Sequence, residues 1–236
     1  MNTTESRYVR STKDTQLLTQ VAKGERGADL ALVNATLLNV YTGELLDNHS
    51  VCVWDRWIAY VGETPDGSIQ KQTQIIDLKG NTLIPGFIDA HTHLASLATP
   101  HEFLKYAIPG GTTSIVTETL EPYPIAGLAG VTDFLESLDN QPVKIFATAP
   151  PMVSTSRAAS GIKMEDLKRL LERDEILGLG ESYWQAVQQH PELYLPILNE
   201  TLHFGKTLEG HTAGARGKRL MACLATGISS CHEPIQ

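Results

Sequence analysis

The chain has 236 residues, of which 42% are hydrophobic and 19% charged, a composition typical of a soluble globular protein. Its net charge of −8 excludes the basic surface that nucleic acids or anionic membranes attract, so we predict neither partner. The short apolar runs of the N-terminus and three widely spaced cysteines (Cys52, Cys223 and Cys231) predict a cytoplasmic protein with reduced thiols.

The first part of the chain is predicted to be an extension followed by a small sheet domain. Within residues 1–27, Ser11 and Asp14 resemble a helix cap, and Gly24 can end a short helix. Residues 28–84 contain β-type runs that are separated by turn residues, without a helical pattern between them. These runs are Leu30–Val33, Thr36–Val40, Val51–Trp54, Ile58–Val61 and Ile75–Leu78.

From Pro85 onward, strand-like and helix-like segments alternate. The predicted strands are Phe87–His91, Thr112–Thr117, Val143–Ala149, Ile176–Glu181, Thr207–His211 and Gly227–His232. The predicted helices are Phe103–Ile108, Ile125–Leu138, Met164–Arg173, Trp184–Phe204 (broken by two prolines) and Ala215–Ala225. This alternation predicts an α/β fold with parallel strands, either doubly wound or a (β/α)₈ TIM-type barrel. As a barrel, residues 85–236 would be truncated after about six strands.

Two histidines lie at the end of the first of these strands. His91 closes the strand, and His93 follows two residues later. Residues i and i+2 of a strand point to the same side, so both imidazoles can face the barrel axis. A His-x-His pair alone is a weak signal, but active sites of barrels are built at the carboxyl ends of the strands. We therefore predict that His91 and His93 bind a metal ion.

Three other strand ends carry residues that commonly bind metals, namely Glu181, His211 and His232. Because the carboxyl ends of barrel strands meet at one rim, these side chains are expected to converge with the first pair. Four imidazoles and a carboxylate able to bridge two ions predict the two-metal site of a hydrolase. Glu181 is thus expected to serve in catalysis as well as in metal binding.

The role of Glu233, beside His232, stays open between two interpretations. It is either a solvated surface residue or a catalytic residue that contacts the substrate or shuttles a proton. The remaining histidines are expected to have structural or surface roles only (His49, His101, His190 and His203).

Other catalytic motifs fail in this sequence. His190-Pro191-Glu192 matches the first half of the zinc nucleobase deaminase signature, but no Cys-x-x-Cys follows it. The glycine-rich stretches lack the lysine and spacing of phosphate-binding loops, and no Gly-x-Ser-x-Gly elbow of a serine hydrolase is present.

Several segments resemble the adenine deaminase branch of the amidohydrolase superfamily, from about Leu17 to the last residue. They are Ala28-Asp29-Leu30, Asn39-Val40-Tyr41-Thr42-Gly43-Glu44, Leu83-Ile84-Pro85-Gly86-Phe87-Ile88-Asp89-Ala90-His91-Thr92-His93, Gly178-Leu179-Gly180-Glu181, Glu209-Gly210-His211, Gly217-Lys218 and Gly227-Ile228-Ser229-Ser230-Cys231-His232-Glu233. The resemblance implies that His91 and His93 hold one metal ion, that His211 and His232 hold the other, and that Glu181 bridges them.

The resemblance also implies a reaction and its cofactors. The family converts adenine and water to hypoxanthine and ammonia, by attack of a metal-bridged hydroxide on the purine carbon that bears the amine. The expected cofactors are two divalent ions, manganese or iron, with zinc as an alternative. The family's proton-transferring Asp ends the eighth barrel strand, so we expect this chain to be a fragment of a longer protein.

Two departures from the family pattern leave alternatives open. Thr117-Glu118-Thr119-Leu120 stands where the family has Asp-Pro-His-Glu, and Ser182-Tyr183-Trp184 follows the bridging carboxylate. Both loops border the expected substrate position. A relative that acts on another cyclic or acyl C–N bond is therefore one alternative, and an inactive metal-binding fragment is another. The expected partner is a small molecule such as a purine base, and homo-oligomer formation stays open.

Overall fold

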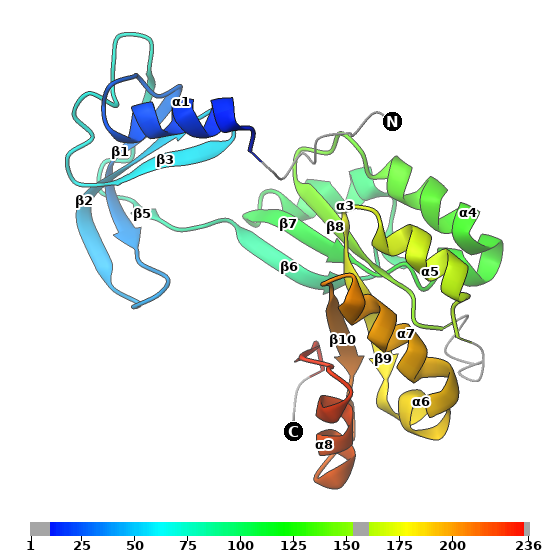
Figure 1. Ribbon diagram of the computed structural model, residues 1–236. Coiled ribbons are helices and arrows are strands. Elements are labelled where there is room, and N and C mark those ends of the chain that lie inside the picture. The colour runs from blue at the N-terminus through cyan, green and yellow to red at the C-terminus, as the bar shows by residue number, and fades with distance from the viewer. Residues whose placement is uncertain (1–9, 153–160, 234–236) are drawn as a thin grey trace. The chain divides into compact units, whose positions relative to one another are not determined.

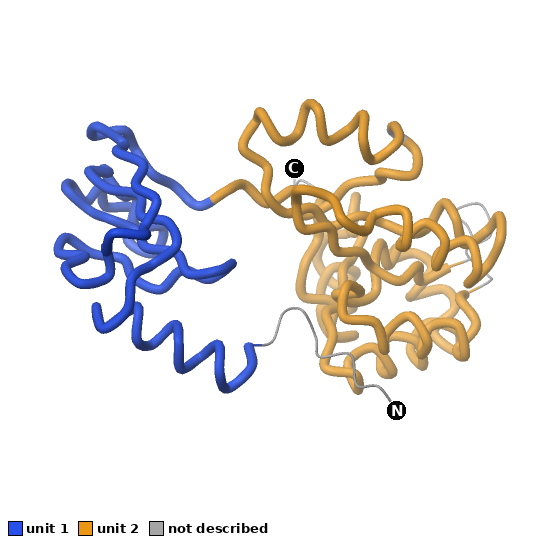
Figure 2. Tube along the Cα trace, turned by 90° about the horizontal axis from the view of Figure 1, so that it is seen from above, with its two compact units in different colours: residues 1–85 blue, residues 86–236 orange. Residues whose placement is uncertain are grey.

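The computed structural model describes residues 10–152 and 161–233 (Figure 1). The chain divides into two compact units, Met1–Pro85 and Gly86–Gln236 (Figure 2). Each unit has a sheet and a hydrophobic core of its own. Within the described ranges, no helix combines the length and the apolar character needed to cross a membrane.

The first unit is a small mixed sheet with one helix. Its elements are α1 (Thr12–Ala22), β1 (Leu30–Leu38), β2 (Leu45–Trp54), β3 (Trp57–Gly62), β4 (Gln74–Asp77) and β5 (Thr82–Leu83). The strands lie in the order β3-β2-β1-β4, and β5 also pairs with β1. Ser11 caps α1, since its Oγ accepts the backbone N–H of Asp14 at 3.1 Å. Val21 of this helix is buried with Ala31 and Cys52, so α1 closes the core of the sheet.

The first strand of this unit joins two segments that the sequence pattern separates. The predicted run Leu30–Val33 and most of the run Thr36–Val40 form the single strand β1, which ends at Leu38 and whose register shifts between Leu32 and Ala35. Asn34 lies in this irregularity with a φ of 56°, a left-handed conformation that asparagine tolerates better than most residues. The bulge, rather than a turn, is therefore what interrupts the apolar pattern.

The second unit alternates strands and helices. Its elements are β6 (Phe87–Thr92), α2 (Leu94–Leu97), α3 (Pro100–Ala107), β7 (Thr112–Thr117), α4 (Pro122–Ser137), β8 (Lys144–Ala149), α5 (Met164–Leu171), β9 (Ile176–Tyr183), α6 (Trp184–Gln189), α7 (Pro191–His203), β10 (Thr207–His211), α8 (Lys218–Ala225) and β11 (Ser230–Cys231). All pairings within its sheet are parallel, and the strands lie in the order β11-β10-β9-β8-β7-β6.

This strand order decides between the two architectures that the sequence leaves open. Each strand pairs with the next one in the chain, as in a singly wound barrel, whereas a doubly wound sheet reverses its order at a switch point. The helices α5 and α7 pack against β8, β9 and β10 and cover their apolar residues. Leu170, Leu179, Leu198 and Leu208 are completely buried in this layer. The predicted α/β fold with a barrel-type parallel sheet is confirmed.

Two details of this unit follow from single residues. The predicted helix from Trp184 to Phe204 is split at His190, whose φ of −130° and ψ of 55° are not helical, directly before Pro191. The last strand, β11, contains only two residues, and Gly227, where the prediction had placed its start, adopts a φ of 93° instead. That conformation belongs to a turn, so the strand begins later than predicted.

The three thiols differ sharply in exposure, which predicts selective alkylation. Burial raises the pKa of Cys52, and it is also the largest cause of the raised pKa of Cys223. Both thiols therefore carry less thiolate at pH 8 than a free cysteine does, whereas Cys231 is exposed. We expect iodoacetamide at pH 8 to label Cys231 alone, as measured by peptide mass spectrometry. A control in 8 M urea should label all three, and labelling of Cys52 in the folded chain would contradict the buried position.

Candidate metal centre

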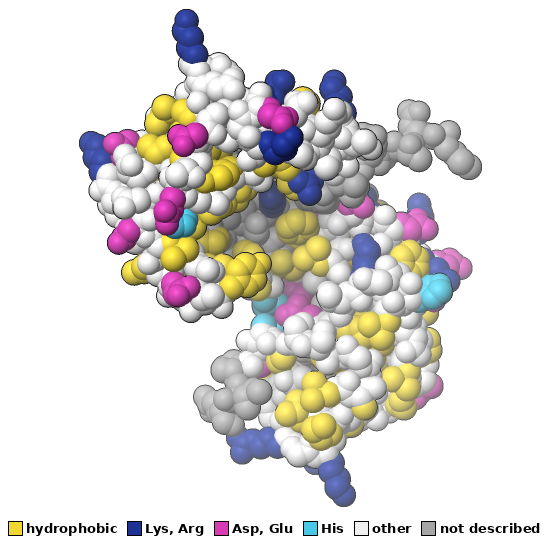
Figure 3. All heavy atoms as spheres, turned by 60° about the vertical axis from the view of Figure 1, so that its left-hand side comes forward, with side chains coloured by type: hydrophobic (Ala, Val, Ile, Leu, Met, Phe, Trp, Pro, Cys, Tyr) yellow, Lys and Arg dark blue, Asp and Glu magenta, His cyan; other side chains and the backbone are white. Residues whose placement is uncertain are grey.

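The five predicted metal ligands converge at the carboxyl ends of the strands. His91 lies in β6, His93 directly follows β6, and Glu181 lies in β9. His211 is the last residue of β10, and His232 follows β11. In the space-filling view, a group of histidine side chains adjoins acidic side chains (Figure 3). Four chain segments thus supply the side chains of one cluster.

Glu181 stands at the centre of this cluster. Its Oε1 lies 3.3 Å from Nε2 of His91 and 3.4 Å from Nε2 of His93. The same oxygen lies 3.3 Å from Nε2 of His232 and 3.7 Å from Nδ1 of His211. The side chain of Glu181 is only 6% exposed. A single buried carboxylate oxygen therefore faces one nitrogen of each of four imidazoles.

The charges of the cluster change the protonation of its members. Burial disfavours the negative charge of Glu181, but the contact with His91 and the nearby His93, His211 and His232 outweigh burial and lower its pKa to about 2. Burial likewise disfavours a positive charge on His91, but contacts with Glu181 and Glu209 raise its pKa to about 10. The carboxylates around His91 therefore favour positive charge at this position, from a proton or from a bound cation.

The donor atoms form three groups, one of which joins His91, Glu209 and His232, while the other two contain Glu181. His91, His93 and Glu181 offer ligand atoms within 4.8 Å of one another, and so do Glu181, His211 and His232. The Nε2 atoms of His91 and His93 are 3.3 Å apart, and Nδ1 of His211 lies 3.2 Å from Nε2 of His232. Imidazole nitrogens that face each other and a carboxylate are the donor set that Zn, Mn and Fe ions use. The residues fit two divalent ions that share Glu181.

Glu233 lies at the rim of the cluster. Its Oε1 is 3.5 Å from Nε2 of His211 and 3.8 Å from Nε2 of His232, and its side chain is 30% exposed. It thus faces the cluster while it remains accessible to solvent, a position from which a carboxylate can contact a small molecule.

Three further acidic residues that the sequence analysis missed also belong to the site. Glu118 directly follows β7 and is 1% exposed, and burial followed by the charge of Glu209 raises its pKa to about 8. Glu121 Oε1 lies 2.6 Å from Nδ1 of His93. Glu209 Oε1 lies 3.0 Å from Nδ1 of His232. Two sequence signals could have found them: Glu118 stands at a strand end, and Glu209 precedes His211 by two residues on the same strand face.

Tyr183 adds an aromatic wall to the cluster. Its ring stacks on that of His211 with 4.1 Å between the centroids, and its hydroxyl lies 3.4 Å from Oε2 of Glu181. Burial and the adjacent Glu181 raise the pKa of Tyr183 to about 12, so its hydroxyl remains a hydrogen-bond donor at neutral pH. In the sequence, Tyr183 is apparent only as a departure from the family pattern.

The other histidines lie outside the cluster. His101 and His203 are exposed on α3 and α7, and His190 lies 3.7 Å from Glu192. His49 in the first unit is 2.9 Å from the backbone oxygen of Asp47. None of the four belongs to a metal-binding group within the described residues.

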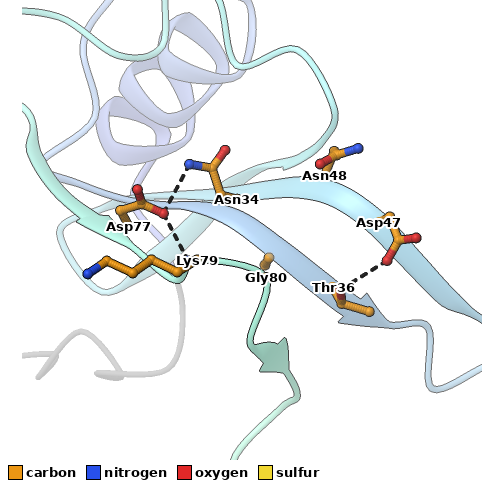
Figure 4. A pocket seen from close by; sticks show the side chains of 8 residues that line it. Asn34, Thr36, Asp47, Asn48, Asp77, Lys79 and Gly80 are labelled. Carbon is orange, nitrogen blue, oxygen red and sulfur yellow. Dashed lines mark hydrogen bonds between the residues drawn. The ribbon is translucent and has the colours of Figure 1, made fainter.

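The first unit also has a polar hollow of about 340 Å³, shown in Figure 4. Asn34 donates to Asp77 at 3.0 Å, and Thr36 donates to Asp47 at 2.9 Å, so these side chains are paired with one another. Asn34 and Asp47 are exposed. The hollow therefore lacks the converging buried groups that distinguish the metal centre.

Comparisons with known proteins identify relatives of this chain. A family model for the amidohydrolase family matches residues 82–232, a range that includes all five predicted ligands. The adenine deaminase of Cenarchaeum symbiosum (strain A) is 32% identical over 222 residues, which are 92% of this chain and 36% of that protein. Adenine deaminase 2 of Carboxydothermus hydrogenoformans is 33% identical over 222 residues, 92% of this chain and 37% of that protein. The chain thus spans little more than a third of the length of these relatives.

Solved structures share the fold. The β-aspartyl dipeptidase of Fervidobacterium islandicum AW-1 superposes with a TM-score of 0.57 and 18% identity, over 89% of this chain and 57% of that one. An adenine deaminase superposes with a TM-score of 0.56 and 17% identity, over 84% of this chain and 54% of that one. These likenesses confirm the TIM-type barrel architecture. The family match over residues 82–232 shows that the chain belongs to the amidohydrolase family.

Proposed function

We propose that this chain carries the metal centre of an adenine deaminase, which converts adenine and water to hypoxanthine and ammonia. The observation that carries the proposal is the position of Glu181, whose Oε1 faces four imidazoles at 3.3–3.7 Å. Support for the substrate comes from the adenine deaminases that are 32–33% identical over 92% of the chain. A purine base as small-molecule substrate and a cytoplasmic location are parts of the same proposal.

The proposed ligands divide between two ions. His91 and His93 would hold one, His211 and His232 the other, and Glu181 would contact both. Two divalent ions, manganese or iron, supply activation of water near neutral pH and polarisation of the bond under attack.

The chain's own carboxylates have distinct proposed tasks. Glu181 is held in place between β8 and β10 and sets the spacing of the two histidine pairs. Glu233, at the solvent-accessible rim, would accept a proton of the attacking water at its carboxylate and pass it to the leaving amine. Tyr183, which stacks on His211, would provide one wall of the substrate site and exclude water from it.

Ammonia release tests the proposed function. The chain is loaded with Mn²⁺ and incubated with adenine, and ammonia and hypoxanthine are measured in parallel. We expect equal amounts of both products, and none from a His91→Ala variant. A chain that binds two ions yet releases no ammonia from adenine would contradict the adenine deaminase assignment.

A second candidate rests on the loops after β7 and β9. Glu118 stands after β7 and Tyr183 lies at the end of β9, two residues after Glu181, so this rim differs from the adenine deaminase pattern. A relative acting on another cyclic or acyl C–N bond would use the same metal ligands with different substrate contacts. Turnover of a cyclic amide such as hydantoin, without turnover of adenine, would favour this candidate. Two bound ions without turnover of either compound would favour a metal-binding fragment.

A further inference from the structure

We propose that Glu209 is a positioning residue shared by both halves of the metal centre. One oxygen of its carboxylate faces Nδ1 of His91, a ligand of the first proposed ion, and Nδ1 of His232, a ligand of the second. This inference rests on the proposed two-metal site and adds a residue to it. Glu209 would contact two metal-binding histidines, from distant parts of the chain, on the Nδ1 side of their rings.

The geometry of the two rings supports this role. The imidazoles of His91 and His232 stack with 3.6 Å between their centroids and an interplanar angle of 11°. Both rings present Nε2 to Oε1 of Glu181, at 3.3 Å each. Both present the opposite nitrogen, Nδ1, to Oε1 of Glu209, at 3.1 Å for His91 and 3.0 Å for His232. The stacked pair thus lies between two carboxylates, one on the metal side and one behind it.

The two contacts with Glu209 differ in quality. The contact with His232 has hydrogen-bond geometry. Nδ1 of His91 is buried, and no contact that it makes has hydrogen-bond geometry. The nearest carboxylate oxygens are Oε1 of Glu209 at 3.1 Å and Oε1 of Glu118 at 3.7 Å. A buried N–H without an acceptor is unfavourable, so a small rotation of the ring toward Glu209 is favoured. Contacts of this kind commonly tighten when a site is loaded.

The chemistry of metal-binding histidines explains what the contact accomplishes. A neutral imidazole that binds a metal through Nε2 carries its proton on Nδ1, and a carboxylate that accepts this proton fixes both the tautomer and the ring orientation. Because a carboxylate oxygen has more than one lone pair, Oε1 of Glu209 can accept from two rings. Glu209 would therefore prepare both rings for binding.

The fold holds Glu209 in this position. It lies on β10, pairs with Ser230 of β11 and is two residues before His211 on the same face of the strand. Its side chain is 14% exposed. At Gly210, an added Cβ would lie 2.6 Å from Cγ2 of Ile228, so the strands approach closely beside it.

Glu121 provides a natural contrast. Its Oε1 accepts from Nδ1 of His93 at 2.6 Å and from the hydroxyl of Ser96 at 3.1 Å. Among the hydrogen bonds and ion pairs of the described residues, these join Glu121 to a single histidine of the cluster. Removing the charge of Glu121 should therefore affect one ion, whereas removing that of Glu209 should affect both.

Titration of the metal-free chain with Mn²⁺ tests this difference. Isothermal calorimetry of the wild-type chain should resolve two equivalents. In Glu209→Gln we expect the dissociation constants of both to rise by about 10- to 100-fold, and in Glu121→Gln that of only one. Glu165→Gln, an exposed residue of α5, is the matched control and should bind as the wild type does. Glu209→Asp, which keeps the charge with a shorter reach, should fall between wild type and Glu209→Gln.

The outcomes separate this inference from the proposed function. A wild-type chain that binds no Mn²⁺ would overturn both. Two normal sites, or a single weakened site, in Glu209→Gln would overturn the inference and leave the two-metal centre intact. A third Mn²⁺ equivalent that disappears in Glu209→Gln would also overturn it, since Glu209 would then be a metal ligand together with His91 and His232. Equal urea midpoints of the metal-free variants exclude a general loss of folding as the cause.

Discussion

Replacing Glu181 with alanine is expected to abolish the binding of both metal ions, whereas replacing His93 should weaken one. Glu181 belongs to two of the three ligand groups that the described residues form, and its Oε1 lies within 3.7 Å of a nitrogen of each of the four imidazoles. The loss of metal affinity should exceed the factor of about 10 to 100 that substitutions of residues behind the metal ligands typically cause. Metal content after gel filtration, measured by inductively coupled plasma mass spectrometry, should fall from about two ions per chain to none.

The matched control for this prediction is Glu175→Ala. Glu175 precedes β9, binds Arg173 at 2.6 Å and lies outside the metal-binding groups of the described residues, so its removal should leave metal content unchanged. Retention of one or two ions by Glu181→Ala would show that the imidazoles suffice, and the bridging role of the carboxylate would then be wrong.

Two of the barrel strands were predicted with the bounds that the structure shows. The segments Thr112–Thr117 and Thr207–His211 form strands with those same bounds. The prediction succeeds there because Gly111 and Lys206 directly precede these segments and end the preceding pattern. It fails at β11, because a left-handed glycine and a close turn take the place of strand residues.

The residues of the candidate site could likewise be predicted only in part from the sequence. Histidines at strand ends are conspicuous because few structural roles require them there, so His91, His211 and His232 could be selected from the sequence. Glutamates such as Glu118 and Glu209 are common on protein surfaces, so their positions near strand ends are a weaker signal than their burial. Burial depends on how distant strands pack, which a single sequence does not specify.

The carboxylates that the sequence analysis missed explain why this many histidines can share one small volume. Glu209 and Glu121 contact the outer nitrogens of the rings, and Glu181 contacts the inner ones. Without these acceptors, buried imidazole N–H groups would be left unsatisfied. The acidic residues therefore orient the rings and partly neutralise positive charge, whether this comes from protons or from metal ions.

Replacing Gly178 with alanine should destabilise the barrel unit. Gly178 lies in the middle of β9 and pairs with Thr207 of β10, and an added Cβ would overlap the backbone oxygen of Thr207. Backbone atoms cannot move aside as a flexible side chain can, so β9 and β10 would have to separate. Overpacking of this kind costs about 1–3 kcal/mol, and we expect the upper part of this range in urea unfolding of the metal-free chain.

The control is Gly110→Ala, because the nearest atom to a Cβ there, the backbone oxygen of Ala107, lies 3.3 Å away. That variant should unfold close to the wild-type urea concentration. Separation of the two strands would also move Glu181, three residues after Gly178, away from His211 on β10. Gly178→Ala should therefore lose Mn²⁺ affinity as well as stability. Unchanged stability and affinity would mean that β9 and β10 do not approach as closely at this point as the structure indicates.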